Sequence, residues 1–244
     1  MVNSKSKFLE LSKKFKILKK LYFFYNIYIR NYKFLKNGTQ FGEDKYIIEL
    51  FDKNFVGKFL DIGCYHPTRH NNTYTMYKSG WSGMNIDLNP LTIELFDFMR
   101  PRDININSGV SDTEIEKKLY FIDELNTQNT LDQNQLNFLK NHHNIKESEI
   151  LEKKIQTRNL NNILDDHKFY NIDFMNLDIE GHELKVLETL DFNKINIKYL
   201  CIEMIEHNEE SVLNNKKIKD LLSQNNFKLI KNFDFNYIYK KENQ

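Results

Sequence analysis

Two short apolar runs organise the hydrophobic pattern of this chain. Residues 59–62 form the first run, and residues 84–87 form the second, which ends in an acid. Short apolar runs of this kind are typical of strands that are buried on both faces of a parallel sheet. Between the runs, Gly63 permits a sharp turn, and residues 68–79 can form a helix that ends at Gly80. The pattern therefore predicts a βαβ unit, an arrangement that binds nucleotides at its first turn.

Residues around this turn narrow the class of ligand. Asp87, at the end of the second run, is placed to hold the hydroxyls of a ribose. Tyr65 and Pro67 follow Gly63, whereas a pyrophosphate needs close approach of the backbone on both sides of the turn. The turn therefore favours S-adenosylmethionine over NAD or FAD. The residues alone leave open a generic α/β sheet in which Asp61 and Asp87 only cap helices.

Four segments of the chain resemble the FkbM-type methyltransferases. They read DIGCYHPTRHNNTYTMYKSGWSGMNIDLNP at 61–90, SGVSD at 108–112, NLDIEGHELKVLETLD at 176–191 and CIEM at 201–204, and the resemblance covers about residues 40–240. It implies a Rossmann-like class I methyltransferase that uses S-adenosylmethionine, usually for O-methylation. The His-Pro pair after the turn is similar to one subgroup, in which an Asn-Thr pair opens the next helix. The resemblance therefore places four more residues in the cofactor site: Cys64, Tyr65, Asn72 and Thr73.

The order of the remaining predicted elements continues this fold. Apolar runs and helical spacings predict, in order, helix 91–99, strand 104–107, strand 174–177, a helix from Glu180, strand 199–202, helix 211–224 and a hairpin of 227–230 with 237–240. Strands that alternate with helices predict an α/β fold, with a mostly parallel sheet and helices on both faces. The terminal hairpin predicts an antiparallel last strand, as class I methyltransferases have.

Two parts of the chain fall outside this alternation. Residues 1–40 form a basic, aromatic-rich extension, and a polar break at Gly38 separates it from the methyltransferase-like domain of residues 41–244. Within that domain, residues 117–158 form an insertion before the fourth strand that mixes strand and helix patterns. We expect the insertion to shape an acceptor pocket, although its residues define no chemistry.

Composition limits the environment and the partners of the protein. The 35 Lys and Arg balance the 34 Asp and Glu, so the overall charge indicates no nucleic-acid partner. The two cysteines, Cys64 and Cys201, fall within or beside predicted buried strands, and their spacing suits neither a zinc site nor a disulfide framework. We therefore expect buried thiols and a cytoplasmic protein.

The overall balance conceals a strongly basic extension. Up to Lys36 the chain carries ten basic residues and one acid, Glu10. The apolar run 21–29 is too short to span a bilayer, which needs about 20 residues. Apolar residues recur at helical spacing, at Phe8, Leu11, Phe15, Leu18, Tyr22 and Tyr25.

A basic amphipathic helix of this kind can lie on an anionic membrane surface or on an acidic protein. Residues 1–36 therefore predict a peripheral contact, which for a membrane would be at the inner face. The alternative is an ordinary packing helix whose lysines face water.

Polar residues follow five of the predicted strands. Because parallel strands end at one edge of a sheet, we expect these residues to face one crevice, where open α/β sheets bind their ligands. The strand-end residues of this predicted cofactor site are Asp61 with Gly63, Asp87, Ser111 with Asp112, Asp178, and Glu203.

The segment after the fourth strand carries the candidate catalytic groups. Methyl transfer to a hydroxyl requires an aligned acceptor oxygen and a base that takes its proton. Asp178, Glu180 and His182 are predicted to form this catalytic edge, with Glu203 on the next strand. His182 has the ordinary pKa best suited to proton transfer near neutrality, whereas Asp178 and Glu180 could share a proton or hold a divalent cation. The alternative for Glu180 and Glu183 is that they are acids in the first turn of a helix, where the helix dipole favours them.

Two functions from different classes remain. The first is an S-adenosylmethionine-dependent O-methyltransferase that acts on a hydroxyl of a sugar or glycan precursor in surface polysaccharide or related biosynthesis; the resemblance alone supplies this acceptor class. The second is a non-catalytic nucleotide-binding scaffold that docks to a membrane or a glycosyltransferase complex. Cofactor binding without turnover on any acceptor would favour the scaffold.

Overall fold

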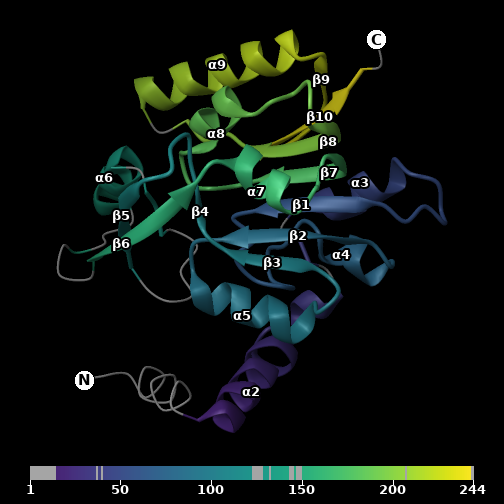
Figure 1. Ribbon diagram of the computed structural model, residues 1–244, viewed down its shortest axis with the longest axis vertical. Coiled ribbons are helices and arrows are strands. Elements are labelled where there is room, and N and C mark those ends of the chain that lie inside the picture. The colour runs from purple at the N-terminus through teal and green to yellow at the C-terminus, as the bar shows by residue number, and fades with distance from the viewer. Residues whose placement is uncertain are drawn as a thin grey trace.

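The strand β1 (Lys58–Ile62) is an interior strand of a seven-stranded sheet in the computed structural model of the protein (Figure 1). The structure describes residues 15–36, 38–39, 41–122, 129–131, 133–142, 146, 150–206 and 208–242. The strand order is β3-β2-β1-β7-β8-β10-β9. The other strands are β2 (Ser82–Asp87), β3 (Ile104–Asn107), β7 (Asn171–Leu177), β8 (Asn196–Glu203), β9 (Phe227–Phe233) and β10 (Asn236–Lys241).

The pairing directions confirm the predicted fold class. Neighbours from β3 to β8 pair in parallel, whereas β10 runs antiparallel to both β8 and β9. The protein therefore has a Rossmann-like α/β fold with a mostly parallel sheet and an antiparallel C-terminal strand. The antiparallel strand is inserted between β8 and β9, although it is the last strand of the chain.

Side chains of the central strands alternate between two hydrophobic cores, as the twofold period of a strand requires. From β1, Leu60 and Ile62 face the larger core, which α7 (Leu160–Asp166), α8 (Glu183–Thr189) and α9 (Glu209–Gln224) cover. Phe59 faces the opposite core with α3 (Glu43–Glu49) and α4 (Tyr74–Lys78). The same alternation places Asp61 on the Phe59 face, where its carboxylate is fully buried.

A smaller sheet flanks the edge where the parallel strands end. It contains β4 (Gly109–Val110), β6 (Leu151–Arg158) and β5 (Glu116–Phe121), in that order, and α6 (Gln133–His142) lies beside it (Figure 1). A hydrogen bond of 2.9 Å from Thr130 Oγ1 to the carbonyl oxygen of Glu180 connects the predicted insertion to the segment after β7. The insertion is thereby attached to the edge that carries the candidate catalytic groups.

The described part of the extension packs on α5 (Pro90–Met99). It forms α2 (Lys16–Phe24), a π-helical segment Tyr25–Arg30 and a 3-10 turn Tyr32–Leu35. Phe23 and Ile27 are buried against Leu91 and Leu95 of α5. Within the described ranges, no helix combines the length and apolar character that crossing a bilayer requires.

The buried face of the extension agrees with the predicted one only in part, because Leu18 and Tyr22 are half-buried and Tyr22 packs against the cluster on α5. Phe15 and Tyr25, which helical spacing assigned to the apolar face, are exposed, and Phe23, Asn26 and Ile27 are buried instead. The docking site on α5 selects this face, because apolar residues occur all around α2 and the sequence pattern alone cannot rank its sides. Phe8 and Leu11 of the predicted face lie outside the described residues.

Two predicted helices begin later than expected because side chains bind the backbone ahead of them. The helix predicted from residue 68 begins at Tyr74. Before it, His66 Nδ1 accepts hydrogen bonds from the amides of Thr68 and Arg69, and Asn71 Oδ1 accepts one from the amide of Thr73. These local bonds compete with a helical first turn.

The helix expected from Glu180 begins at Glu183 instead. Glu180 and Gly181 have φ angles of 55° and 97°, which place them in a left-handed turn. The carboxylate of Glu183 accepts hydrogen bonds from the amides of Ile179 and Gly181, so it fixes this turn. Glu180 therefore does not occupy the first turn of a helix, and the helix-dipole interpretation is wrong for this residue, whereas Glu183 does lie in the first turn of α8.

Candidate active site

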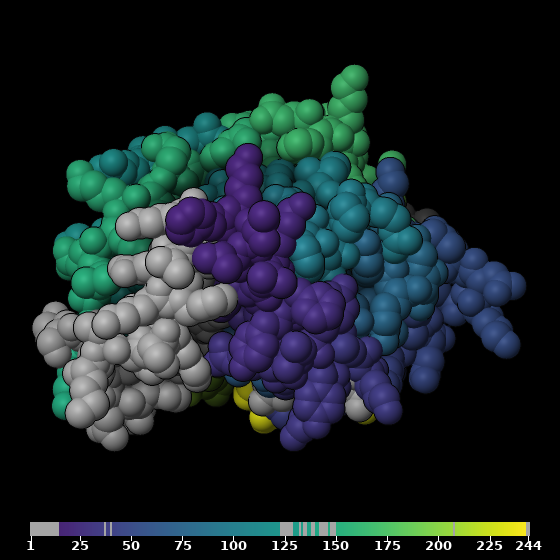
Figure 2. Space-filling view, turned by 90° about the horizontal axis from the view of Figure 1, so that it is seen from below, coloured from purple at the N-terminus to yellow at the C-terminus, as the bar shows by residue number. Residues whose placement is uncertain are grey.

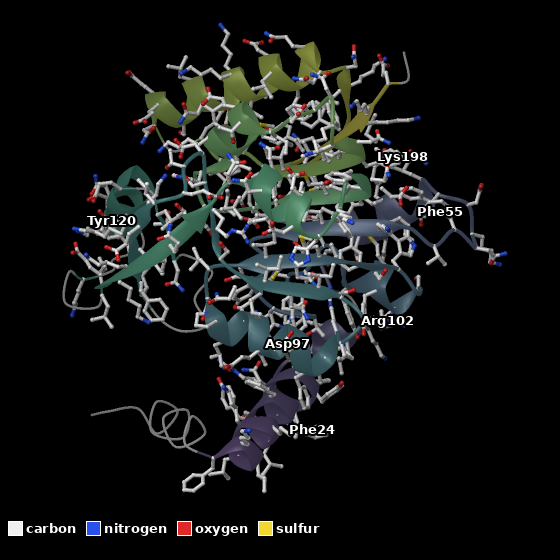
Figure 3. All side chains as sticks on the ribbon, in the orientation of Figure 1. Phe24, Phe55, Asp97, Arg102, Tyr120 and Lys198 are labelled. Atoms are coloured by element: carbon white, nitrogen blue, oxygen red, sulfur yellow. The ribbon has the colours of Figure 1, made fainter. Side chains whose placement is uncertain are left out.

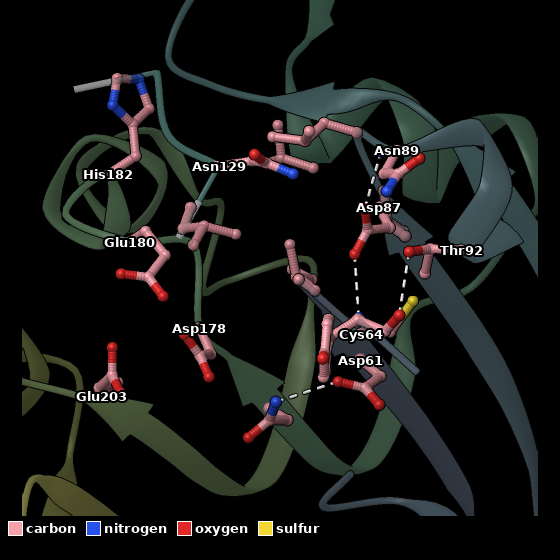
Figure 4. A pocket seen from close by; sticks show the side chains of 18 of the residues that line it. Asp61, Cys64, Asp87, Asn89, Thr92, Asn129, Asp178, Glu180, His182 and Glu203 are labelled. Carbon is pink, nitrogen blue, oxygen red and sulfur yellow. Dashed lines mark hydrogen bonds between the residues drawn. The ribbon is translucent and has the colours of Figure 1, made fainter. Parts of the chain in front are cut away.

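A cavity of about 300 Å³ opens at the carboxyl ends of the central strands (Figure 4). Asp61 of β1, Asp87 of β2 and Glu203 of β8 contribute to its lining, and so do Gly63 and Asp178, which follow β1 and β7. The parallel direction of the strands brings these ends together. Four of the five predicted strand-end groups therefore surround one space, whereas residues 111–112 do not line it.

Gly63 makes the close approach between β1 and β7 possible. Its φ angle is 78°, and a Cβ atom at this position would lie 1.6 Å from the carbonyl oxygen of Asp178. The amide of Asp178 donates to the carbonyl oxygen of Ile62 at 3.0 Å, so the two chain segments stay paired beyond the sheet. Only glycine fits this turn, and the turn sets the floor of the cavity.

Asp61 is held by donors from the protein itself. Its Oδ2 accepts hydrogen bonds from Asn71 Nδ2 at 3.0 Å and Thr73 Oγ1 at 2.8 Å, and its Oδ1 accepts one from Asn176 Nδ2 at 3.0 Å. Burial raises the pKa of Asp61, while these bonds and the charge of Arg100 oppose that rise. Although Asp61 borders the cavity, its hydrogen bonds to the protein stabilise the turn.

Arg100 completes this buried network. It is fully buried at the end of α5 and donates to the carbonyl oxygen of Pro67, to Thr73 Oγ1 and to Asn71 Oδ1. Its positive charge balances Asp61 through the shared partners Thr73 and Asn71. The segment between β1 and α4 is therefore fixed at both its start and its end.

Asp87 is fixed by two backbone amides. Tyr65 N donates to Oδ2 at 2.9 Å, and Asn89 N donates to Oδ1 at 2.7 Å (Figure 4). Burial raises the pKa of Asp87 to about 6, although both amides oppose the rise. Each carboxylate oxygen keeps a further lone pair, so Asp87 can accept hydrogen bonds from two ligand hydroxyls.

Three carboxyl groups face one another at the other side of the cavity. Ligand oxygens of Asp178, Glu180 and Glu203 all lie within 4.8 Å of one another (Figure 4). Asp178 and Glu203 share a hydrogen bond, so this pair holds a proton. Burial and the charges of Glu183 and Asp61 raise the pKa of Asp178 to about 7. Burial and the charge of Asp178 raise the pKa of Glu203 well above its usual range.

His182 borders the cavity, but its ring is engaged outside the acidic cluster. Its Nε2 lies 2.9 Å from Ser111 Oγ and 3.4 Å from Lys117 Nζ. Ser111 donates to Asp112, and Asp112 also forms a 3.0 Å ion pair with Lys117. Of the two predicted cofactor residues, Ser111 therefore contacts His182 directly and Asp112 acts on it through Ser111. Residues 108–110 line the cavity in their place.

The four residues that the family resemblance placed in the cofactor site do not all line the cavity. Cys64, Tyr65 and Asn72 line the cavity, whereas Thr73 is fully buried and acts on Asp61. Burial, with the charges of Asp87 and Asp61, raises the pKa of the Cys64 thiol well above its usual range, so the thiol stays neutral. Both cysteines are free and buried, as predicted.

Several polar residues that build the site were not found from the sequence. Asn176 shares the register position and face of Asp61 on the neighbouring strand, a relation that the strand pairing makes visible. Asn89 stands before Pro90, and this helix-start signal could have found it. Asn129 reaches the cavity from the insertion, and Arg100 reaches the turn from α5. No sequence signal marks these last two.

Comparison with known proteins identifies the family of the chain. No curated protein matches the chain. The family model for the methyltransferase FkbM domain matches residues 61–229, which is more than half of the chain and includes all four strand-end groups of the cavity. The protein therefore belongs to the FkbM methyltransferase family.

Proposed function

We propose that the protein is an S-adenosylmethionine-dependent O-methyltransferase that acts on a hydroxyl of a sugar or glycan precursor, in surface polysaccharide or related biosynthesis. One observation carries the proposal. A single cavity has the Asp87 carboxylate on one side and the Asp178–Glu203 carboxyl pair on the other (Figure 4). The first group suits a ribose, and the second suits removal of a proton from an acceptor.

The residues around Asp87 fit the adenosyl part of this cofactor. Asp87 is held rigid by two amides and keeps acceptor capacity for two ribose hydroxyls. Leu88 and Val110 add apolar surface that suits a purine ring. Carboxylates at Asp61 and Asp178 provide a negative environment for a sulfonium, and the bound cofactor would supply an electrophilic methyl group.

The Asp178–Glu203 pair is the proposed general base. A base works best when its pKa is near the working pH, and the pKa of Asp178 is about 7. Glu180 lies beside the pair and is proposed to orient the acceptor hydroxyl toward it. His182 is proposed to position this edge, because its Nε2 faces Ser111 and its backbone carbonyl accepts the first hydrogen bond of α8.

The same three carboxylates offer hard oxygen ligands that suit a divalent cation. A cation would replace the shared proton and would bind the acceptor oxygen electrostatically. The two roles differ in their response to a chelator. EDTA abolishes turnover and added magnesium restores it only if the cation is required.

The acceptor class rests on the polar lining of the cavity and on the family. Asn72, Asn129 and Asn176 add amide groups beside the carboxylates, and such groups match a hydroxyl-rich ligand better than an apolar one. Asn129 belongs to the insertion, which is consistent with a role of that segment in acceptor selection.

The test is methyl transfer from labelled S-adenosylmethionine to a panel of nucleoside-diphosphate sugars and glycosides. We expect Asp178→Asn and Glu203→Gln to lower kcat by roughly 10²- to 10⁴-fold, the usual range for loss of a general base. Affinity for S-adenosylhomocysteine should change little, because the base acts in the transition state. Glu180→Gln should be at least ~10-fold slower, because the acceptor hydroxyl loses the carboxylate that orients it toward the base.

Glu206→Gln is the matched control, because Glu206 is exposed, lies three residues beyond Glu203 and does not line the cavity. Full turnover in both Asp178→Asn and Glu203→Gln would overturn the base assignment. Tight cofactor binding with no transfer to any hydroxyl would favour the scaffold function instead.

We further propose that the extension places the enzyme peripherally on an anionic membrane, at the inner face if the protein is cytoplasmic. The extension forms a ridge on the face shown in Figure 2. Apolar Ile17, Leu21 and Phe24 are exposed on α2, and Lys16 and Lys20 of the same helix are also exposed. Figure 3 labels Phe24 on this helix. Apolar side chains flanked by lysines suit the interface of an anionic bilayer.

Vesicle sedimentation tests this contact. The native chain should sediment with vesicles that contain phosphatidylserine, less so as salt rises, because salt screens the lysines. Ile17→Ser with Phe24→Ser should abolish the effect, whereas Leu229→Ser, which removes an exposed apolar residue on β9, should not. Unchanged sedimentation of the double variant would exclude α2 as the contact, and binding to a protein alone would replace the membrane as partner.

A further inference from the structure

Arg69 stands at the border of the cavity with its guanidinium between two aromatic rings. Its guanidinium carbon lies 5.9 Å from the ring centre of Phe34 and 5.7 Å from that of Tyr65. Stacking of this kind holds the planar group in place and leaves its N–H edge available for an acceptor. Phe34 comes from the 3-10 turn of the extension, so residues distant in sequence enclose this side chain.

The guanidinium of Arg69 differs from that of Arg100 in its hydrogen bonding. Arg100 donates to three protein oxygens, whereas within the described part of the chain no carboxylate or other acceptor bonds the guanidinium of Arg69. The cavity lining is otherwise rich in acids, including Asp87, Asp178 and Glu203. An anionic group that enters this space is stabilised at Arg69 and repelled elsewhere.

His66 fixes the backbone at Arg69 and joins it to the extension. His66 Nδ1 accepts from the amides of Thr68 at 3.2 Å and Arg69 at 3.1 Å. Because Nδ1 is an acceptor, the ring proton resides on Nε2, which donates to Asn26 Oδ1 at 3.0 Å. Asn26 is buried in the π-helical segment, so the extension holds both the backbone and the stacked side chain of Arg69.

From this geometry we propose that Arg69 is the subsite for a ligand carboxylate, and that Phe34 of the extension positions it. The inference rests on the proposed function, because the cavity must hold the methyl donor and an acceptor. Two ligands can supply the carboxylate: the amino-acid end of S-adenosylmethionine, or an acidic sugar. A planar guanidinium suits both, since it binds a carboxylate through two parallel N–H bonds.

The first arm of the test compares S-adenosylmethionine with its decarboxylated form, which keeps the sulfonium and the amine. We expect the native chain to bind the carboxylate form more tightly, and Arg69→Gln to bind it at least ~10-fold more weakly, with little change for the decarboxylated form. Arg102→Gln is the matched control, because Arg102 also stacks on a tyrosine, at 4.2 Å from the Tyr77 ring centre, but lies outside the cavity (Figure 3).

The second arm uses a hexuronic acid glycoside and the matching neutral glycoside, each titrated with saturating cofactor product present. If the acceptor supplies the carboxylate, Arg69→Gln weakens only the acidic glycoside and leaves both cofactor forms unchanged. If Arg69→Gln changes neither arm, or weakens every ligand equally, the subsite is overturned. Failure of the native chain to bind any adenosyl compound would instead overturn the proposed function.

Phe34 variants test the positioning role. Phe34→Ala should reduce the preference for the carboxylate-bearing ligand, and Phe34→Tyr should retain it because the ring remains. A purely structural role would lower thermal stability without altering this preference. Equal preference in Phe34→Ala and the native chain would contradict positioning by the extension.

Discussion

The carboxyl groups of the cavity fall into two sets that differ in their hydrogen-bond partners. On the β1–β2 side, Asp61 and Asp87 accept hydrogen bonds from amides and side chains of the protein. On the β7–β8 side, the side chains of Asp178 and Glu203 share a hydrogen bond, and among the described residues no other donor contacts the Asp178 carboxyl group. Asp61 is fully buried, whereas Asp87, Asp178 and Glu203 are partly exposed, and the two sides also differ in the number of hydrogen-bond donors that the protein supplies.

This contrast indicates what each set is for. A buried carboxylate with several donors stabilises the turn that it holds, because its charge is compensated within the protein. Two carboxyls that face each other share one proton at neutral pH, so one of them stays ionised and can accept a proton from an acceptor hydroxyl, whereas a bound cation would displace the shared proton. Under the proposed function, the β1–β2 set therefore shapes the cofactor site, and the β7–β8 set takes part in the chemistry of the acceptor.

The largest expected effect is the loss of stability on removing Asp61. In Asp61→Asn, an amide N–H meets donors from Asn71, Thr73 or Asn176, and buried Arg100 loses its balancing charge. We expect the free energy of unfolding to fall by about 3 kcal/mol, the scale for breaking a buried charge network. Urea denaturation measures it. A loss below ~1 kcal/mol, as for an exposed residue, would remove the distinction between the two sets.

The second prediction concerns the pH dependence of stability in the ligand-free protein. Burial raises the pKa of Asp178 to about 7, so the folded state binds a proton more tightly than the unfolded state. The stabilisation from this proton is fully present below about pH 4 and is lost as pH rises through about 7, and the rise of about three pKa units corresponds to about 4 kcal/mol.

Asp178→Asn should therefore flatten the decline in unfolding free energy between pH 5 and 8, and should be more stable than the native chain at pH 8. A decline should remain in the variant, because burial also raises the pKa of Glu203 and raises that of Asp87 to about 6. Parallel curves for the variant and the native chain would show that Asp178 does not hold this proton.

The third prediction is a loss of affinity on changing Asp87. Asp87→Asn replaces a charged acceptor with a neutral amide. Loss of one hydrogen bond to a charged group costs about 1.5–3 kcal/mol of binding free energy. Binding of S-adenosylhomocysteine should weaken roughly 10- to 100-fold in calorimetry. Asp112→Asn is the informative control. The sequence placed Asp112 in the same site, but in the structure it pairs with Lys117 and does not line the cavity. The affinity of the Asp112→Asn variant for S-adenosylhomocysteine should therefore be unchanged.

The smallest effect is expected for an exposed pair. Lys19 Nζ lies 2.5 Å from Glu94 Oε1, and both side chains remain partly exposed, at 27% and 41%. Solvent screening limits such pairs to at most about 1 kcal/mol, so Lys19→Ala should lower the free energy of unfolding by about 0.5 kcal/mol. A loss comparable to that of Asp61→Asn would show that this pair, and not Phe23 with Ile27, holds the extension on α5.

Local patterns in the sequence predicted the elements of the cofactor site. Strand ends follow from short apolar runs, and Gly63 and Asp87 follow from the βαβ plan. The start of α4 could not be predicted in this way, because it depends on His66 and Asn71, whose side chains bind the backbone. Ser111 and Asp112 were predicted by position along the strand, yet the third strand ends before them and β4 joins the smaller sheet.

The sequence alone determined the α/β fold, the FkbM resemblance and the edge of the sheet at which the acids gather. These properties depend on periodicity and on motifs, which short stretches of chain encode. The tertiary structure decided which acids receive donors. The bond from Asn176 to Asp61 joins residues 115 positions apart, and the bond from His66 to Asn26 joins residues 40 apart. Contacts of this range depend on how the sheet pairs and on where the extension docks, because only the folded chain brings such residues within hydrogen-bond distance.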